Sequence, residues 1–339
     1  MTDDTILIAG QTIVRGQSCQ INIPVAKLYT DTELFIPVHI QRANKAGPTV
    51  FVSAAIHGDE LNRVEIIRLI ASKLNIIKGT LILVPMVNVY GVLNQSRYLP
   101  DRRDLNRCFP GSVKGSLASR LAHTFMTNIV QHCDYGIDLH TGAIHRSNLP
   151  QIRANLADEE TLSLAKAFGV PVLMNANLRD GSLREAATSN NTRILLYEAG
   201  EALRFDPLSI QAGVKGVKNV LMSLGLLRKS RRKKHPIEPF VSNKSEWIRA
   251  AGSGFVNEAV KLGERVEKGQ VLAEINSPLG APIQKVTSTR SGIIIGKQNI
   301  PLVQEGDAMF HVAYFGKDED DVAEHIELLH DLVESDRGV

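Results

Sequence analysis

After residue 48 the chain alternates between short apolar runs and amphipathic segments, and no other feature constrains its fold as strongly. Residues 49–56 form one such run, after which apolar side chains recur at helical spacing at Leu61, Val64, Ile67, Ile70 and Leu74. Strands that alternate with amphipathic helices are typical of crossover units around a parallel or mixed sheet. We therefore predict an α/β domain in which helices flank a mixed sheet.

Further segments extend this pattern. A strand is predicted over residues 80–87 and a helix over 116–132, which begins at the capping residue Ser116. Asp206 is expected to cap a long helix, because Pro207 would occupy its first turn. Residues 1–40 contain short strand-like pieces, which we expect to form antiparallel edge strands.

The region after residue 235 contains an internal two-fold repeat. Residues 253–256 match 291–294, and residues 266–272 match 303–309, at offsets of 38 and 37 residues. These short strands and glycine turns resemble the small β barrel-sandwich of biotinyl and lipoyl domains. A carrier domain would need a Met-Lys pair in the joining hairpin, and residues 276–285 have none, so a lid or an oligomerisation module is expected instead.

The length and the composition shifts suggest three parts. A chain of 339 residues exceeds one typical domain. We predict an α/β domain over residues 1–235, a β barrel-sandwich domain over 236–316 and an acidic C-terminal helix or tail over 317–339. The run 228–234 has six basic residues in seven positions and is interpreted as a solvated linker.

Three side chains at the ends of apolar runs form a candidate metal site. His57 and Glu60 follow the first run, and His140 ends another at residues 135–139. In open α/β sheets, strand ends of this kind meet where ligands bind. Two imidazoles and one carboxylate leave a fourth position on zinc open for water, as a hydrolytic site requires. Asp138 lies on the same face of its strand as His140.

A charged segment over residues 97–111 is a second candidate for function. It is too polar and too rich in turn residues for a core element, so we predict a surface loop. Its arginines could hold a carboxylate by paired hydrogen bonds. The alternative is a solvated basic loop without a ligand.

Glu198 is the candidate general base. Residues 193–197 are expected to form a buried strand, so a carboxylate at its end would lie at the same sheet edge as the metal site. Glu201 is a competing candidate. Either residue could instead be a helix-start carboxylate that the helix dipole stabilises.

Taken in order, these motifs resemble the succinylglutamate desuccinylase/aspartoacylase family, a branch of the zinc carboxypeptidase superfamily. The resemblance covers about residues 35–315, and it implies a zinc-carboxypeptidase-like fold with residues 1–235 as the zinc hydrolase domain. The matching pieces are His57-x-x-Glu60, Asp104-Leu105-Asn106-Arg107 with Phe109-Pro110-Gly111, Asp138-Leu139-His140-Thr141-Gly142 and Glu198-Ala199-Gly200.

The resemblance implies a role for each matching residue around the metal. His57, Glu60 and His140 would hold one zinc ion, and Glu198 would be the general base. Asp104 would orient His57, since metal-bound histidines generally need a partner on their other ring nitrogen. Asp138 is expected to support His140 in the same way.

The resemblance also implies a substrate site. Asn106 and Arg107 would bind the substrate carboxylate, with Arg103 beside them. An upstream arginine would polarise the scissile carbonyl, and Arg97 is our first choice, with Arg103 as the alternative. The family usually has an Asn-Pro pair after the second strand, whereas this chain has Asn88-Val89, so the loop that enters the site is expected to differ in shape.

Composition excludes several other classes of protein. The net charge of +3 does not indicate a nucleic-acid partner, and the acidic N-terminal residues show neither a signal peptide nor a membrane span, so a cytoplasmic location is expected. The three cysteines, Cys19, Cys108 and Cys133, are scattered. Their spacing argues against disulfides and against a thiolate zinc site.

We therefore predict a zinc-dependent amidohydrolase that removes the acyl group from an N-acyl amino acid or a similar small carboxylate. Esters and acylated diamino acids remain open as substrates, as does a homo-oligomeric state. One alternative is a metallocarboxypeptidase that acts on peptide C-termini. Another, of a different class, is a non-catalytic, zinc-stabilised binding module that contacts nucleic acid or an acidic partner through the basic run 228–234.

Overall fold

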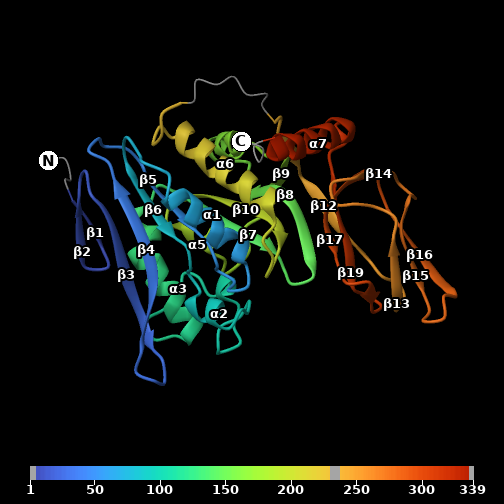
Figure 1. The fold of residues 1–339 in the computed structure, drawn as a ribbon, viewed down its shortest axis with the longest axis horizontal. Coiled ribbons are helices and arrows are strands. Elements are labelled where there is room, and N and C mark those ends of the chain that lie inside the picture. Colours follow the sequence, from blue (N-terminus) through green and yellow to red (C-terminus); the bar gives the residue numbers. More distant parts are fainter. Residues whose placement is uncertain (1–4, 230–236, 336–339) are drawn as a thin grey trace.

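The computed structural model describes residues 5–229 and 237–335 of the chain. Within these residues, a 13-stranded mixed sheet runs through the molecule, with a separate two-stranded hairpin and a separate four-stranded sheet. The hairpin and the four-stranded sheet lie at opposite ends of the molecule (Figure 1). Among the described residues, no helix has both the length and the apolar character needed to cross a bilayer.

The centre of the large sheet is parallel. β5 (Thr49–Ser53) lies between β6 (Thr80–Val84) and β7 (Tyr135–Gly142), and β10 (Arg193–Glu201) pairs with β7. Because these four strands run in one direction, their carboxyl ends meet at one edge of the sheet. The predicted mixed sheet is confirmed.

Antiparallel strands continue the sheet on the N-terminal side. β4 (Glu33–Arg42) pairs with β6, and β3 (Ser18–Lys27) pairs with β4. The small hairpin consists of β1 (Thr5–Ile8) and β2 (Gln11–Val14). The antiparallel edge strands predicted for residues 1–40 are therefore present.

Helices cover both faces of the sheet. Side chains alternate along a strand, so Val50 and Val52 of β5 pack into the core on one face while Phe51 packs into the core on the other. The first face is covered by α1 (Leu61–Ala71), α4 (Glu159–Phe168) and α6 (Pro207–Ser223), and the second by α2 (Val89–Leu93), α3 (Leu117–Asn128) and α5 (Leu183–Ser189).

Two helix starts lie where the sequence places them. The Ser116 side chain accepts a hydrogen bond from the backbone N–H of Ser119, and Asp206 accepts one from Leu208. The helix predicted over 116–132 is interrupted, because Ile129 has a non-helical conformation between α3 and a short 3₁₀ turn, η2 (Val130–His132).

The C-terminal β region, residues 240–314, has its own apolar core. It agrees with the predicted smaller β domain. Its strands are β11 (Phe240–Ser242), β12 (Lys244–Arg249), β13 (Gly254–Glu258), β14 (Arg265–Val266), β15 (Val271–Asn276), β16 (Pro282–Thr287), β17 (Gly292–Gln298), β18 (Leu302–Val303) and β19 (Ala308–Tyr314). β13, β15, β16 and β18 form the four-stranded sheet.

Backbone hydrogen bonds join this region to the large sheet. β8 (Arg146–Ala154) pairs with β10 on one side and with β17 on the other, both antiparallel. β11 pairs with β9 (Val172–Asn175). The division of the chain at residue 235 stays a prediction, and the two parts that it separates share one continuous sheet.

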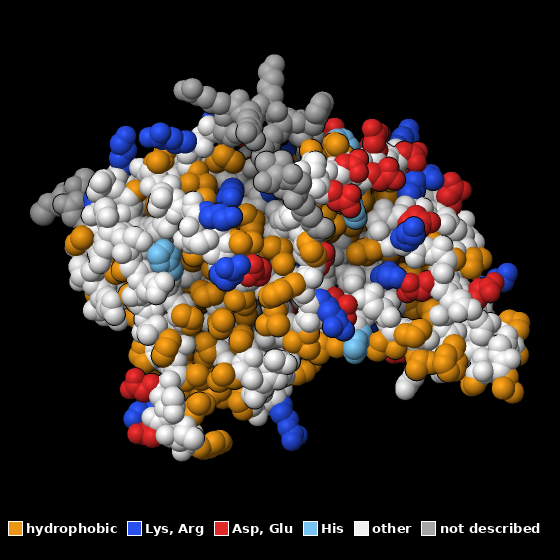
Figure 2. Space-filling model, in the orientation of Figure 1, with side chains coloured by type: hydrophobic (Ala, Val, Ile, Leu, Met, Phe, Trp, Pro, Cys, Tyr) orange, Lys and Arg blue, Asp and Glu red, His pale blue; other side chains and the backbone are white. Residues whose placement is uncertain are grey.

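The last helix, α7 (Glu319–Ser335), lies beside α6 (Figure 1). On the inner side of α7 its own residues Val322, Ile326 and Leu329 are buried, while acidic side chains gather on its outer face (Figure 2). An exposed helix or tail was predicted, but its helically spaced apolar residues bury one side. Of the basic run 228–234, residues 230–234 lie outside the described part of the chain. Cys19, Cys108 and Cys133 are free thiols.

Candidate metal centre and active site

His57 and Glu60 lie in the turn between β5 and α1. Gly58 is required in this turn, because a Cβ atom there would lie 1.9 Å from the backbone of Gly91 at the start of the next helical segment. Glu60 occupies the position just before the first residue of α1. The tight turn therefore places both side chains at the carboxyl edge of the parallel strands.

His140, near the end of β7, meets these two residues. The Nδ1 atom of His57 lies 2.7 Å from Oε1 of Glu60, and the Nδ1 atom of His140 lies 3.0 Å from Oε2. One ligand atom from each residue can be chosen so that all three lie within 4.8 Å of one another, and all three residues are buried. Apart from Nδ1 of His140, the buried Oε2 of Glu60 has no polar partner among the described residues. This donor set fits a divalent cation such as zinc.

The other ring nitrogens of both histidines face aspartates. Nε2 of His57 lies 3.1 Å from Asp104, and Nε2 of His140 lies 2.7 Å from Asp138. The Ser53 hydroxyl donates a 2.8 Å hydrogen bond to the second oxygen of Asp138. The aspartates therefore hold both rings with Nδ1 towards Glu60, the arrangement that metal-binding histidines usually require.

The charges of this group depend on one another. Burial disfavours ionised Glu60, but the two imidazoles hold the pKa of Glu60 well below its usual value. Burial likewise disfavours charged His140, but Asp138 and Glu60 raise the pKa of its imidazole. A cation bound at Nδ1 must displace the protons of these imidazoles, so metal affinity is expected to increase with pH.

Arg97 reaches the candidate metal-ligating group, which consists of His57, Glu60 and His140, from the charged loop. Its guanidinium donates a 2.9 Å hydrogen bond to Asp104 and lies 3.3 Å from Nδ1 of His57. Burial opposes the positive charge, but Asp104 and Glu60 outweigh this effect and raise the pKa of Arg97. Arg97 is therefore a fixed cation beside the candidate metal site.

The structure does not bring Arg103 into the site. Its side chain is 61% exposed and lies 4.0 Å from Asp101, and it does not line the cavity. The backbone N–H of Arg103 also bonds to Asp101, so the local turn directs the side chain towards solvent. The role of Arg103 in substrate binding stays a prediction, and Arg97 is the better-placed of the two arginines.

Asn106 and Arg107 lie on a short 3₁₀ turn, η1 (Leu105–Arg107), which Asp104 caps through the N–H of Asn106. The side-chain oxygen of Asn106 accepts a 2.9 Å hydrogen bond from the N–H of Leu183 at the start of α5. Both residues line the cavity. The charged loop is thus a structured wall of the site.

Glu198 lies beside the ligands. Its strand, β10, continues to Glu201 instead of ending at residue 197 as predicted, and a bulge follows Glu198. It is the register partner of His140 across β10 and β7, and it lines the same cavity. Asn148 of β8 donates a hydrogen bond to Oε2 of Glu198. Glu201, the competing candidate, instead accepts hydrogen bonds from the N–H of His145 and the side chain of Asn299.

These residues surround a cavity of about 230 Å³. Three arginines that no motif indicated also line it: Arg153 of β8, Arg179 of the β9–α5 loop and Arg184 of α5. Arg184 donates to the carbonyls of Ala176 and Asn177, and burial, together with the nearby Arg153 and Arg179, lowers its pKa to about 10. The strand that carries Arg153 also contains Arg146, Ser147, Asn148 and Gln151, so its charge did not stand out in the sequence.

All residues that line this cavity, among those described, fall between His57 and Glu198. The C-terminal β region therefore supplies none of the lining, contrary to the expectation of a lid. Its contact with the site is indirect and runs through β8.

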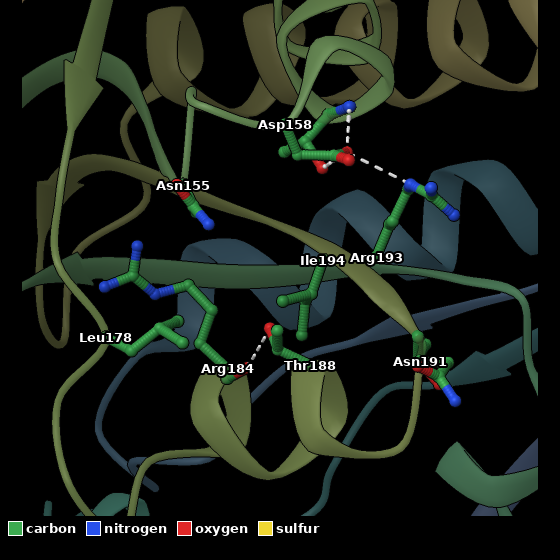
Figure 3. A pocket seen from close by; sticks show the side chains of 10 residues that line it. Asn155, Asp158, Leu178, Arg184, Thr188, Asn191, Arg193 and Ile194 are labelled. Carbon is green, nitrogen blue, oxygen red and sulfur yellow. Dashed lines mark hydrogen bonds and ion pairs between the residues drawn. The ribbon is translucent and has the colours of Figure 1, made fainter.

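A second cavity of about 220 Å³ shares Arg184 with the first (Figure 3). Its one lining carboxylate, Asp158, caps α4 through Thr161 and pairs with Arg193. The residues that line this cavity include no histidine or cysteine. The metal-ligating group and the base candidate thus belong to the first cavity.

Known proteins resemble this chain along most of its length. Residues 46–224 match the family model described as succinylglutamate desuccinylase/aspartoacylase catalytic domain. N-alpha-acetyl-L-2,4-diaminobutyric acid deacetylase of Halomonas elongata is 27% identical over 296 residues, which cover 83% of this chain and 86% of the relative.

Solved structures share the fold. The product-bound ectoine utilization protein EutE (DoeB) of Ruegeria pomeroyi superposes with a TM-score of 0.79 at 23% identity, covering 92% of this chain and 99% of its own. A succinylglutamate desuccinylase/aspartoacylase of Rhodobacter sphaeroides gives a TM-score of 0.78 at 24% identity, covering 88% of this chain and 96% of its own.

Proposed function

Because the chain belongs to the succinylglutamate desuccinylase/aspartoacylase family, we propose that it is a zinc-dependent amidohydrolase that removes the acyl group from an N-acyl amino acid. The observation that carries this proposal is the convergence of His57, Glu60 and His140 at a cavity that Glu198 also lines. Family membership alone supports deacylation. The convergence adds a place for a hydrolytic metal.

His57 and His140 would hold zinc through Nδ1, and Glu60 through its carboxylate. Zinc bound there supplies a water of near-neutral pKa and polarises the scissile carbonyl. Asp104 and Asp138 would keep both rings in the required orientation. The buried Oε2 of Glu60, which among the described residues meets only the ring of His140, would then face a cation.

Glu198 would move the proton. Asn148 occupies Oε2 of Glu198, which leaves Oε1 as the oxygen that accepts a proton from the attacking water. The same carboxyl group would return that proton to the leaving amine. Because Glu198 is the register partner of His140, the proton would be taken up close to the reacting carbonyl.

Arg97 and Arg107 would act on the substrate. Arg97 lies beside His57 and would donate to the oxyanion that forms from the scissile carbonyl. Arg107, with Asn106, would bind the substrate carboxylate and fix the orientation of the amide. Both arginines line the cavity, as these roles require.

The lining also supports a particular class of substrate. Arg153, Arg179 and Arg184 add three cations to the two from the loop, whereas the lining carboxylates are Glu60, Asp138 and Glu198. An Nα-acyl diamino acid would bring the cation of its free side-chain amine into this field already as the substrate. An N-acyl amino acid with a second acidic group, on the amino acid or on the acyl chain, is favoured instead.

One assay tests the function. The purified full chain is analysed for bound metal and incubated with N-acetyl, N-formyl and N-succinyl amino acids, with short peptides as the comparison. We expect metal-dependent release of a free amine, fastest from substrates with two carboxylates. Cleavage of peptides alone would favour a carboxypeptidase, and a metal-loaded protein without turnover on any of these compounds would contradict the proposal.

The binding-module alternative is tested by Glu198→Gln. An enzyme should keep its metal in this variant and lose turnover, because the base is gone while the three ligands remain. A protein whose biological activity survives the substitution would be a binding module. Arg103→Gln is a suitable control, since Arg103 is exposed outside the cavity.

A further inference from the structure

Arg63, three residues after Glu60 on α1, is fully buried and has no part in the proposed reaction. Its NH2 group donates a hydrogen bond to the backbone carbonyl of Ala199. Its guanidinium lies over the ring of Tyr197, with 4.6 Å between the guanidinium carbon and the ring centroid. Among the described residues, Nε and Nη1 of Arg63 have no hydrogen-bond partner. Burying a cation whose donors are partly unpaired destabilises the folded state, so we expect a functional reason for an arginine at this position.

The carbonyl that Arg63 binds belongs to a bulge in β10. The register of β10 shifts between Glu198 and Gly200 against β8, and between Glu198 and Glu201 against β7, so Ala199 has no register partner in either ladder. A bulge re-aims the adjacent side chain. Buried backbone carbonyls need a donor, and Arg63 supplies one to Ala199 at this bulge.

Other contacts tie the start of α1 to the same bulge. Gly200 has a φ of +68°, and a Cβ atom there would lie 2.7 Å from the side-chain nitrogen of Asn62. The side-chain oxygen of Asn62 accepts a 2.8 Å hydrogen bond from the N–H of Asp206. The first turn of α1 therefore holds the segment after Glu198 from one side.

Charge adds to this arrangement. Burial lowers the pKa of Arg63, while Tyr197, Glu60 and Glu198 oppose the loss of its proton. A methionine could fill much of the same space without the cost of burying a charge. Packing alone therefore does not explain Arg63. Its planar set of N–H donors and its positive charge are the properties that need an explanation.

We propose that Arg63 is a positioning residue for Glu198. By holding the Ala199 carbonyl, it fixes the bulge that aims the Glu198 carboxylate at the cavity, and it joins this bulge to the helix that Glu60 begins. The metal ligand Glu60 and the proton acceptor Glu198 would then be positioned by the same contact between α1 and β10. This inference rests on the proposed role of Glu198 as the base.

The test compares Arg63→Met and Arg63→Lys with Arg68→Met. Arg68 is the matched control, because it lies on the same helix with a side chain that is 66% exposed and pairs only with Glu65. Each full-chain variant is measured for bound metal, kcat, KM and backbone amide exchange over residues 196–203. Amide exchange reports local opening without requiring turnover.

For Arg63→Met we expect unchanged metal content, a KM within about threefold of wild type and a kcat lower by about 10- to 100-fold, because the base is misplaced. Exchange over 198–203 should be about tenfold faster, since one buried hydrogen bond is lost. Arg63→Lys keeps a cation, so its kcat and its rate of amide exchange should lie between those of Arg63→Met and wild type. Arg68→Met should behave like wild type.

Wild-type exchange together with an unchanged kcat in Arg63→Met would overturn the proposal. Loss of metal in parallel with kcat would also overturn it, by assigning Arg63 to the ligand turn instead. If Arg63→Met does not fold, Arg63→Lys decides through the same readouts. A wild-type protein that cleaves no N-acyl amino acid would refute the proposed function, whereas the exchange data would still decide whether Arg63 holds the bulge.

Discussion

Asn148 donates a side-chain hydrogen bond to Glu198, and its backbone pairs with Gly296 of the C-terminal β region. A Cβ atom at Gly296 would lie 2.9 Å from the side-chain oxygen of Asn148. The C-terminal β region therefore packs directly against Asn148, the residue that donates a hydrogen bond to the base candidate Glu198. Although it lines none of the cavity, this region is in position to influence the chemistry there.

Replacing Asn148 tests this support. Asn148→Ala removes the donor to Oε2 of Glu198, so the carboxylate should lose its preferred orientation. We expect kcat to fall about tenfold, the effect of one hydrogen bond to a charged group, with little change in KM. Steady-state kinetics measure both constants. Asn299→Ala, which removes a donor to Glu201 and Ser147 but none to Glu198, is the control, and equal losses in both variants would contradict a specific role for Asn148.

Glu60 is the ligand whose loss should be most damaging. Glu60→Gln removes the negative charge between two imidazoles while it keeps the size of the side chain. We expect bound metal to fall below one ion per chain and kcat to drop by at least about 1,000-fold. Elemental analysis and kinetics give the two values. Chelation of the wild type should reproduce the loss and added zinc should reverse it, whereas full activity after complete metal removal would exclude a metal enzyme.

Arg107 and Arg103 form a matched pair in one loop. Arg107→Met removes a guanidinium from the cavity wall, so KM for an N-acyl amino acid should increase by about 30-fold or more, the cost of leaving a carboxylate unpaired. Arg103→Met removes an exposed guanidinium and should leave kcat and KM within about twofold of wild type. If Arg103→Met raised KM as strongly, the carboxylate site would need to be reassigned.

His311 should make stability depend on pH. It is buried in the C-terminal β region, where burial, with the nearby Arg153, lowers its pKa to about 3. In the unfolded chain this imidazole takes up a proton near pH 6.5, whereas the folded state resists protonation. The contribution of neutral His311 is therefore complete above pH 6.5 and is lost as the pH falls, by at most about 1.4 kcal/mol per pH unit.

Urea unfolding between pH 4 and pH 8 measures this dependence. Trp247, the one tryptophan of the chain, stacks on His311 at a centroid distance of 4.6 Å and gives a local fluorescence signal. His311→Gln should flatten the pH profile relative to wild type, while substitution of the exposed His145 should not. Parallel profiles for wild type and His311→Gln would contradict the assignment.

Much of the fold follows from local signals in the sequence. Apolar periodicity depends on residues within one or two turns of each other, so the alternation after residue 48 is sufficient to predict β5, α1 and the mixed sheet. Helix caps are equally local, as Ser116 and Asp206 illustrate. Strand ends predict where His57, Glu60 and His140 lie, because parallel strands end at one edge.

Other features required the tertiary structure. Arg153 and Arg184 reach the cavity from different elements, and Arg103 leaves it because Asp101 holds its backbone and pairs with its side chain. Neither outcome has a spacing that a sequence pattern could reveal. Such placements depend on strand register and on side-chain partners that are distant along the chain.

The sequence by itself determined the element types, the candidate metal-ligating residues and the family, since each depends on short-range periodicity or on a motif of a few residues. Only the tertiary structure decided which arginines line the cavity, which carboxylate Asn148 supports and how Arg63 joins α1 to β10. The physical reason is that these contacts join residues 50 to 136 positions apart, whose meeting is fixed by the long-range pairing of strands and the packing of helices upon them.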